Sequence, residues 1–150
     1  MIRSRPAKTC IKAAILVMAA VSMPGSARTE GVAKGLACTF DSGVSTTYEA
    51  GSFKSKPPQS LKFDITDIDL EAQTARLTTD GGGGAGSLRI IRALNANHFL
   101  EVVNEGFLNL TTVYDLDAAT AAYPAVHSRH LGLVGQPVFA QYTGLCKALP

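Results

Sequence analysis

The segment PAVHSRH contains two of the three histidines of the chain, with an arginine between them. Imidazole is a common zinc ligand and a frequent general base, so His127 and His130 are the first candidates for chemistry. His98 is a candidate third ligand, and Arg129 and Tyr142 complete the candidate site for a ligand or metal. Zinc binding, or a metal-dependent activity at these histidines, is therefore one hypothesis.

The local secondary structure decides whether one ion can contact both histidines. Side chains three positions apart share a face of a helix, but they point to opposite faces of a strand. Residues 125–133 have the pattern of a strand, so we expect His127 and Arg129 on one face. His130 then lies on the other face with Ser128. Only a bulge or turn at Ser128 would bring the two imidazoles together.

Other polar segments favour structural roles. The acidic residues Asp64, Asp67, Asp69 and Glu71 are predicted to form a solvated strand face, because they lack the spacing and glycine of an EF-hand loop. The glycine run 80–86 is predicted to be a hairpin loop, because it lacks the Gly-Lys-Ser/Thr of a phosphate-binding loop. No catalytic residue is predicted, and no cofactor is predicted apart from the zinc alternative.

The N-terminal segment has the pattern of a secretory signal peptide. Basic residues within 3–12 precede the apolar run Ala13–Val21, which is shorter than the about 20 residues of a membrane span. Gly25 and Ala27 fit the small-residue positions of a cleavage site. We therefore expect residues 1–27 to be removed near Ala27 and the mature protein to be periplasmic or secreted.

Removal of this segment changes the sign of the net charge. The chain has 14 basic and 12 acidic residues, and four of the basic ones lie within 1–27, so the mature chain has a net charge of −2. The cluster Lys54, Lys56 and Lys62 is predicted to be a solvated face. Such a chain lacks the basic surface that nucleic acids require. The partners we expect are a small ligand or an envelope protein, with no nucleic acid and no membrane span in the mature chain.

The cysteines indicate an oxidising compartment. Cys10 lies in the predicted signal peptide, which leaves Cys38 and Cys146 as a pair that we expect to form a disulfide. A lipid anchor at Cys38 is not expected, because Gly35 stands where a lipobox needs an aliphatic residue.

Alternating apolar residues between turn residues predict about eight β-strands in one domain, 36–150, after a flexible segment, 28–35. The segments are 36–40, 45–50, 61–70 with a bulge at Thr66-Asp67, 74–79, 87–94 with Leu88, Ile90 and Leu94 on one face, a strand with Leu100 and Val102, 108–114, 125–133 and 138–146. Residues 115–123 are predicted to be a connection with room for one helical turn. Short connections force antiparallel neighbours. The expected fold is therefore all-β, an up-and-down barrel or tight sandwich, closed by a disulfide between the first and last strands.

An eight-stranded barrel is either filled by side chains or holds one small ligand. The aromatic residues expected to pack the interior or line a pocket are Phe99, Phe107, Tyr114, Phe139 and Tyr142. Because the mature chain is short, a filled interior is favoured.

Several segments resemble small exported proteins of alphaproteobacteria that carry one disulfide. They are ACTF, NANHFLEVVNEGF, TTVYD, YPAVHSRH and GQPVFAQYTGLC. The resemblance covers most of residues 36–146 and implies export and a single compact domain, but no activity. The chain is also similar to periplasmic lysozyme inhibitors in being a small, exported, disulfide-linked barrel. Their inhibitory Ser-Gly loop with a following tyrosine is not matched, because Leu88 and Arg89 follow Gly86-Ser87.

These observations favour a non-enzymatic envelope protein that binds a small ligand or a protein partner. One alternative is a metal-binding protein or metal-dependent enzyme that uses His127, His130 and His98. Another alternative is a structural component of the envelope.

Overall fold

The structure is a computed structural model that describes residues 33–79, 86–103, 106–132 and 137–150. The expected signal peptide, most of the expected flexible segment 28–35, and most of the glycine run 80–86 lie outside these ranges. Residues Gly31–Pro150 cluster as one compact unit. Within the described ranges, no helix has the length and hydropathy needed to cross a membrane.

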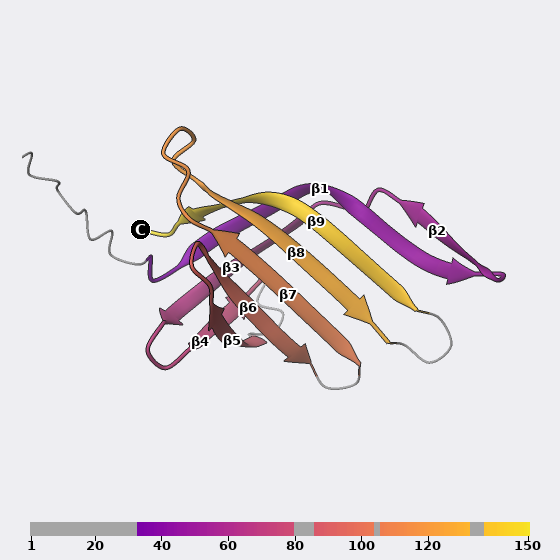
Figure 1. The fold of residues 1–150 in the computed structure, drawn as a ribbon, viewed down its shortest axis with the longest axis horizontal. Helices are drawn as coiled ribbons and strands as arrows, with labels where there is room; N and C mark the ends of the chain where they lie inside the picture. The colour runs from indigo at the N-terminus through magenta and orange to yellow at the C-terminus, as the bar shows by residue number, and fades with distance from the viewer. Residues whose placement is uncertain (1–32, 80–85, 104–105, 133–136) are drawn as a thin grey trace, which may run out of the picture. The chain divides into compact units, whose positions relative to one another are not determined.

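Antiparallel strands account for most of the described chain (Figure 1). They are β1 (Leu36–Glu49), β2 (Ser52–Lys56), β3 (Leu61–Asp69), β4 (Thr74–Thr78), β5 (Gly86–Arg92), β6 (Ala96–Val103), β7 (Phe107–Tyr114), β8 (Tyr123–Leu131) and β9 (Val138–Ala148). The strand order is β2-β1-β3-β4-β5-β6-β7-β8-β9, and β1 also pairs with β9. This pairing closes β1 and β3 to β9 into an eight-stranded barrel, with β2 as one extra strand. The predicted all-β antiparallel fold is therefore confirmed.

The strand β1 is a single long strand where the sequence predicted two segments. A register shift between Phe40 and Ser42 marks a β-bulge. After it, Gly43 and Ser45 are opposite the buried Tyr142 and Ala140, so the inward face changes from even to odd residue numbers. One edge of β1 pairs first with β3 and then with β2, while the other edge pairs with β9. The extra strand β2 was not predicted, because its sequence SFKSK lacks an apolar alternation.

Turns and bulges in the described chain are fixed by polar side chains and by left-handed backbone. The predicted bulge in β3 is confirmed by a register shift between Thr66 and Asp69, with Asp67 at a φ of 52°. The carboxylate of Asp69 accepts hydrogen bonds from the backbone N–H groups of residues 71 and 72, so part of the acidic stretch caps the β3–β4 turn. Between β7 and β8, Asp117 caps a turn by accepting from the Ala119 N–H, which lowers the pKa of its carboxyl.

The barrel interior is packed with side chains. The largest fully buried ones are Phe40, Phe99, Ile65, Ile90, His127 and Cys146. Two expectations for aromatic residues are wrong, because Tyr114 and Phe139 are exposed on the outside of the barrel. Phe99 and Tyr142 are buried as expected, and Phe107 is partly buried on the inward face. The expectation for Leu94 is also wrong, since it is fully exposed in the turn between β5 and β6.

The strands β1 and β9 meet at a seam that holds the predicted disulfide. Cys38 and Cys146 are directly opposite in register, with Cα atoms 4.0 Å apart and an S–S bond of 2.00 Å. Two glycines let the strands approach closely beside the bulge. A Cβ on Gly144 would overlap the backbone of β1 at Thr39 and Phe40, and one on Gly43 would overlap the backbone of β9 at Gln141. Larger residues at these glycines are therefore incompatible with the seam.

Candidate functional site

The three histidines do not converge. His127 points into the barrel and is 1% exposed, whereas His130 points outward from the same strand and is exposed. The predicted placement on opposite faces is thus confirmed, because β8 has no bulge at Ser128. His98 is on the outer face of β6, where its Nδ1 lies 2.9 Å from the Thr112 hydroxyl. One ion cannot contact all three, and no group of three or more metal-ligating side chains occurs within the described ranges.

His127 occupies the centre of the interior. Its Nδ1 lies 2.8 Å from the Thr111 hydroxyl, which is also buried. Three rings surround the imidazole, with centroids 5.6 Å away for Phe40, 5.1 Å for Phe63 and 5.9 Å for Tyr142. The Nε2 atom has no hydrogen-bond partner. Since a buried polar atom without a partner destabilises the fold, this atom is the least satisfied group of the described interior.

This environment keeps His127 neutral at physiological pH. Burial, and secondarily the positive charge of Arg129 two positions along the strand, lowers the pKa of the imidazole to about 4. Arg129 and Tyr142 share the inward face with His127, so the structure brings together three of the candidate residues. A neutral imidazole packed between aromatic rings fills space, and the Thr111 hydroxyl beside it is buried with it, out of contact with solvent.

A polar layer lies beside His127, one inward position further along β6, β7 and β8. Register places Glu101, Asn109 and Arg129 side by side on these three strands. The Asn109 amide donates a hydrogen bond of 2.7 Å to the Glu101 carboxylate. A Cβ on Gly86 would overlap that carboxylate, so the glycine makes room for it. Glu101 and Asn109 are not among the site residues predicted from the sequence, although they alternate with the inward-facing Phe99 and Thr111 on β6 and β7.

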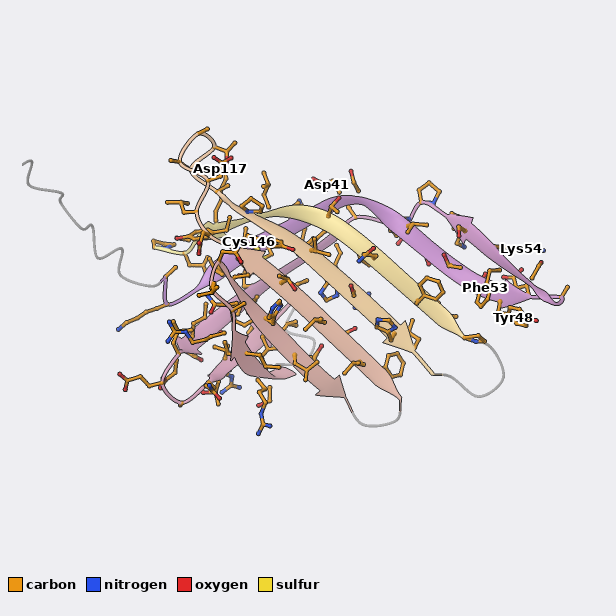
Figure 2. All side chains as sticks on the ribbon, viewed as in Figure 1. Asp41, Tyr48, Phe53, Lys54, Asp117 and Cys146 are labelled. Carbon is orange, nitrogen blue, oxygen red and sulfur yellow. A yellow bond between two sulfur atoms is a disulfide. The ribbon has the colours of Figure 1, made fainter. Side chains whose placement is uncertain are left out.

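Three exposed aromatic side chains form what we call the outer aromatic surface: Tyr48 on β1, Phe53 on β2 and Phe139 on β9. Their exposed fractions are 37%, 62% and 38%. The Tyr48 and Phe53 rings are 4.9 Å apart, and those of Phe53 and Phe139 are 6.2 Å apart, both edge to face. Figure 2 shows Tyr48 and Phe53 at the far end of the β1–β2 hairpin. The surface combines a hairpin, β1–β2, with β9, which is distant from it in sequence.

The outer aromatic surface is well packed at its base and continues across the barrel wall. Thr46 lies between β2 and Phe139 and is only 5% exposed, and its hydroxyl is 2.8 Å from that of Ser55. Away from β2, Phe139 on β9 pairs in register with His130 on β8. His130 in turn pairs with Leu108 on β7, which is 41% exposed. His130 therefore belongs to the border of this surface. The feature of the sequence that could have indicated this surface is the pair of aromatic residues, Tyr48 and Phe53, on either side of the two-residue turn Ala50-Gly51.

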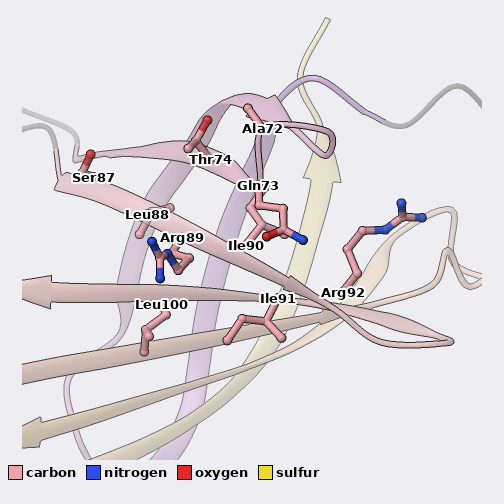
Figure 3. A pocket seen from close by; sticks show the side chains of 10 residues that line it. All are labelled: Ala72, Gln73, Thr74, Ser87, Leu88, Arg89, Ile90, Ile91, Arg92 and Leu100. Atoms are coloured by element: carbon pink, nitrogen blue, oxygen red, sulfur yellow. The ribbon is translucent and has the colours of Figure 1, made fainter.

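An open depression lies on another part of the barrel, beside β5 (Figure 3). Its lining comes from the β3–β4 turn, β4, β5 and β6, and includes Arg89, Ile91, Arg92 and Leu100. None of the residues predicted from the sequence as a site lines it. Its shape and lining point to no particular ligand.

No protein-family model matches the chain, and no curated protein and no solved structure matches it either.

Proposed function

We propose that this small disulfide-linked β-barrel is an exported envelope protein that binds a protein partner through the outer aromatic surface. The observation that carries the proposal is the cluster of Tyr48, Phe53 and Phe139, whose rings contact one another while remaining 37% to 62% exposed. Aromatic side chains are enriched at protein interfaces, because they contribute a large contact area for little conformational entropy. An exposed aromatic cluster at one end of a small barrel is therefore a candidate docking surface.

The packed interior favours an external partner over an internal ligand. The centre of the barrel is occupied by Phe40, Phe63, His127 and Tyr142, so a ligand there would have to displace buried rings. The metal hypothesis loses its geometric basis, because His127 and His130 lie on opposite faces. The role we propose is accordingly a binding role without catalysis.

Export is supported by the signal-peptide pattern before Ala27, by the resemblance to exported proteins, and by the Cys38–Cys146 disulfide. Disulfides persist in oxidising compartments such as the periplasm. Mass spectrometry of the protein recovered from its host tests this step. We expect a chain that begins near residue 28 and is two mass units lighter than its reduced form. A recovered chain that keeps residues 1–27 or has free thiols contradicts export.

The binding role is tested by capturing partners from an envelope extract with three forms of the mature protein. Phe53→Ser removes the most exposed ring of the outer aromatic surface. Leu94→Ser is the matched control, because Leu94 is an equally apolar and fully exposed residue in a different turn. We expect one protein to be retained by the wild type and by Leu94→Ser but lost with Phe53→Ser, and to bind directly once purified.

Two results would overturn the binding role. One is retention of the same protein by Phe53→Ser at the wild-type level. The other is the absence, in every form, of any retained protein that also binds after purification. Because Phe53→Ser also removes two edge-to-face ring contacts, each worth about 0.5–1.5 kcal/mol, urea unfolding of both variants checks that they are folded in the capture experiment.

A further inference from the structure

We infer that the free edge of β2 binds an extended, acidic segment of the partner by strand addition. The inference rests on the proposed function and names the chemistry of the partner. In the described sheet, β2 is the terminal strand and pairs only with β1. All five of its residues are exposed. Such an edge offers unpaired backbone groups to another strand.

The register identifies which backbone groups are free. In an antiparallel pair, residues alternate between hydrogen-bonded and non-hydrogen-bonded positions. The Tyr48 N–H donates to the Pro137 carbonyl on the β9 side, 3.2 Å away, so Tyr48 and its partner Phe53 form a non-hydrogen-bonded pair. Phe53, and by the same alternation Ser55, therefore direct their N–H and C=O groups away from β1. Four backbone groups are available at this edge.

The side chains beside this edge are cationic on one face and aromatic on the other. Lys54 and Lys56 project on one face of β2, and Phe53 projects on the opposite face. Lys54 lies 3.9 Å from Glu49, and both side chains are at least half exposed, so this ion pair is weak. Lys56 has no ion pair among the described residues. The edge therefore presents positive charge that its own strand pair does not neutralise.

The positive charge of Lys54 and Lys56 determines which kind of strand can pair with the free edge of β2. If two copies of β2 paired antiparallel about Lys54, the two Lys54 side chains would be directly opposite, and like charges in that position destabilise a pair. Lysines on an edge strand thus oppose self-association. The same lysines favour a segment whose alternate side chains are carboxylates. The side chains between them would be apolar, because they would lie beside Phe53.

The test uses a synthetic peptide of alternating glutamate and valine, capped at both ends, and the isotope-labelled mature protein. Amide chemical shifts are followed by NMR as the peptide is added up to millimolar concentration. A second peptide has lysine in place of glutamate. A third has the acidic sequence with N-methyl groups on alternate amides, which removes the donors along one edge of a strand.

We expect the acidic peptide to shift the amides of Phe53 and Ser55 most, and the N-methylated peptide to lose this effect. The double substitution Lys54→Glu and Lys56→Glu is expected to weaken binding about tenfold, because two attractive cross-strand pairs become repulsive. The control is Lys62→Glu, a lysine on β3 outside the β2 edge. It is expected to leave binding unchanged.

The inference is overturned if the acidic peptide shifts no β2 amide, or if the lysine peptide binds as well as the acidic one. Either result leaves the proposed binding role standing, because a partner captured by the wild type and by Leu94→Ser but not by Phe53→Ser supports that role without any peptide binding to the β2 edge. Conversely, if the peptide binds at β2 but the extract yields no partner, strand addition stands and the proposed binding role fails.

Discussion

Acidification is expected to destabilise the barrel through His127. The imidazole is neutral in the folded protein because burial, followed by the charge of Arg129, lowers its pKa from 6.5 to about 4. The groups packed against it are the rings of Phe40, Phe63 and Tyr142 and the hydroxyl of Thr111. None of these contacts places a carboxylate beside the imidazole to compensate a positive charge.

The sign of the effect follows from proton binding. Between about pH 6.5 and about pH 4 the unfolded chain binds a proton at His127 and the folded protein does not, so stability rises with pH in this window. Above the window this residue contributes no pH dependence. At about pH 5 the difference amounts to about 2 kcal/mol relative to pH 7.5, which is a large part of the stability of a small domain.

The assay is urea unfolding of the oxidised mature protein, followed by far-ultraviolet circular dichroism at several pH values. His127→Gln removes the titrating group, and we expect it to lose most of the pH dependence between pH 7.5 and 5, although the variant is less stable at every pH. His130→Gln is the matched control, since His130 is exposed on the outer face of the same strand. It should keep the wild-type pH dependence.

The reasoning is refuted if His127→Gln retains the full pH dependence of the wild type. It is equally refuted if the wild type unfolds at the same urea concentration throughout this pH range. A pH dependence that disappears in His130→Gln instead would assign the effect to the outer face of β8.

Three further predictions concern the seam and the interior. Replacing Cys38 and Cys146 together by alanine is expected to lower the free energy of unfolding by about 5 kcal/mol for a sequence separation of 108 residues, and unchanged urea midpoints would contradict it. Gly144→Ala should cost at least about 1–3 kcal/mol by forcing β9 away from β1, measured as a lower melting temperature, whereas wild-type stability would show that the seam adapts. His127→Phe should cost about 1–3 kcal/mol because the Thr111 hydroxyl loses its partner, and adding Thr111→Val should restore much of that loss in the same urea assay.

Local alternation accounts for what the sequence predicted correctly. It placed His127 and His130 on opposite faces of β8. The bulge after Thr66 was predicted because the apolar alternation shifts by one residue there. These features depend on a strand and its immediate neighbours, so a period of two residues is enough to define them.

Long-range pairing accounts for what the sequence did not predict. In β7, alternation separates Leu108 and Leu110 from Asn109 and Thr111, but the more apolar pair faces outward, because the register with β6 and β8 decides which face is inside. Phe139 alternates correctly with Ala140, yet it faces outward and meets Phe53 from the unpredicted strand β2. The outer aromatic surface therefore depends on strand pairings that a single sequence does not specify.

The pairing of β1 with β9 also determines the order of assembly. One edge of β1 pairs with β3 and β2, but the other finds its partner only in β9, so the barrel cannot close until β9 has been synthesised. Until then β1 keeps one unpaired edge, and Cys38 has no thiol within reach on its proper partner strand. Contacts of such long sequence separation slow folding. A chain that stops before β9 is therefore expected to remain open, with the edges of β1 and β8 exposed in addition to that of β2 and a strong tendency to aggregate.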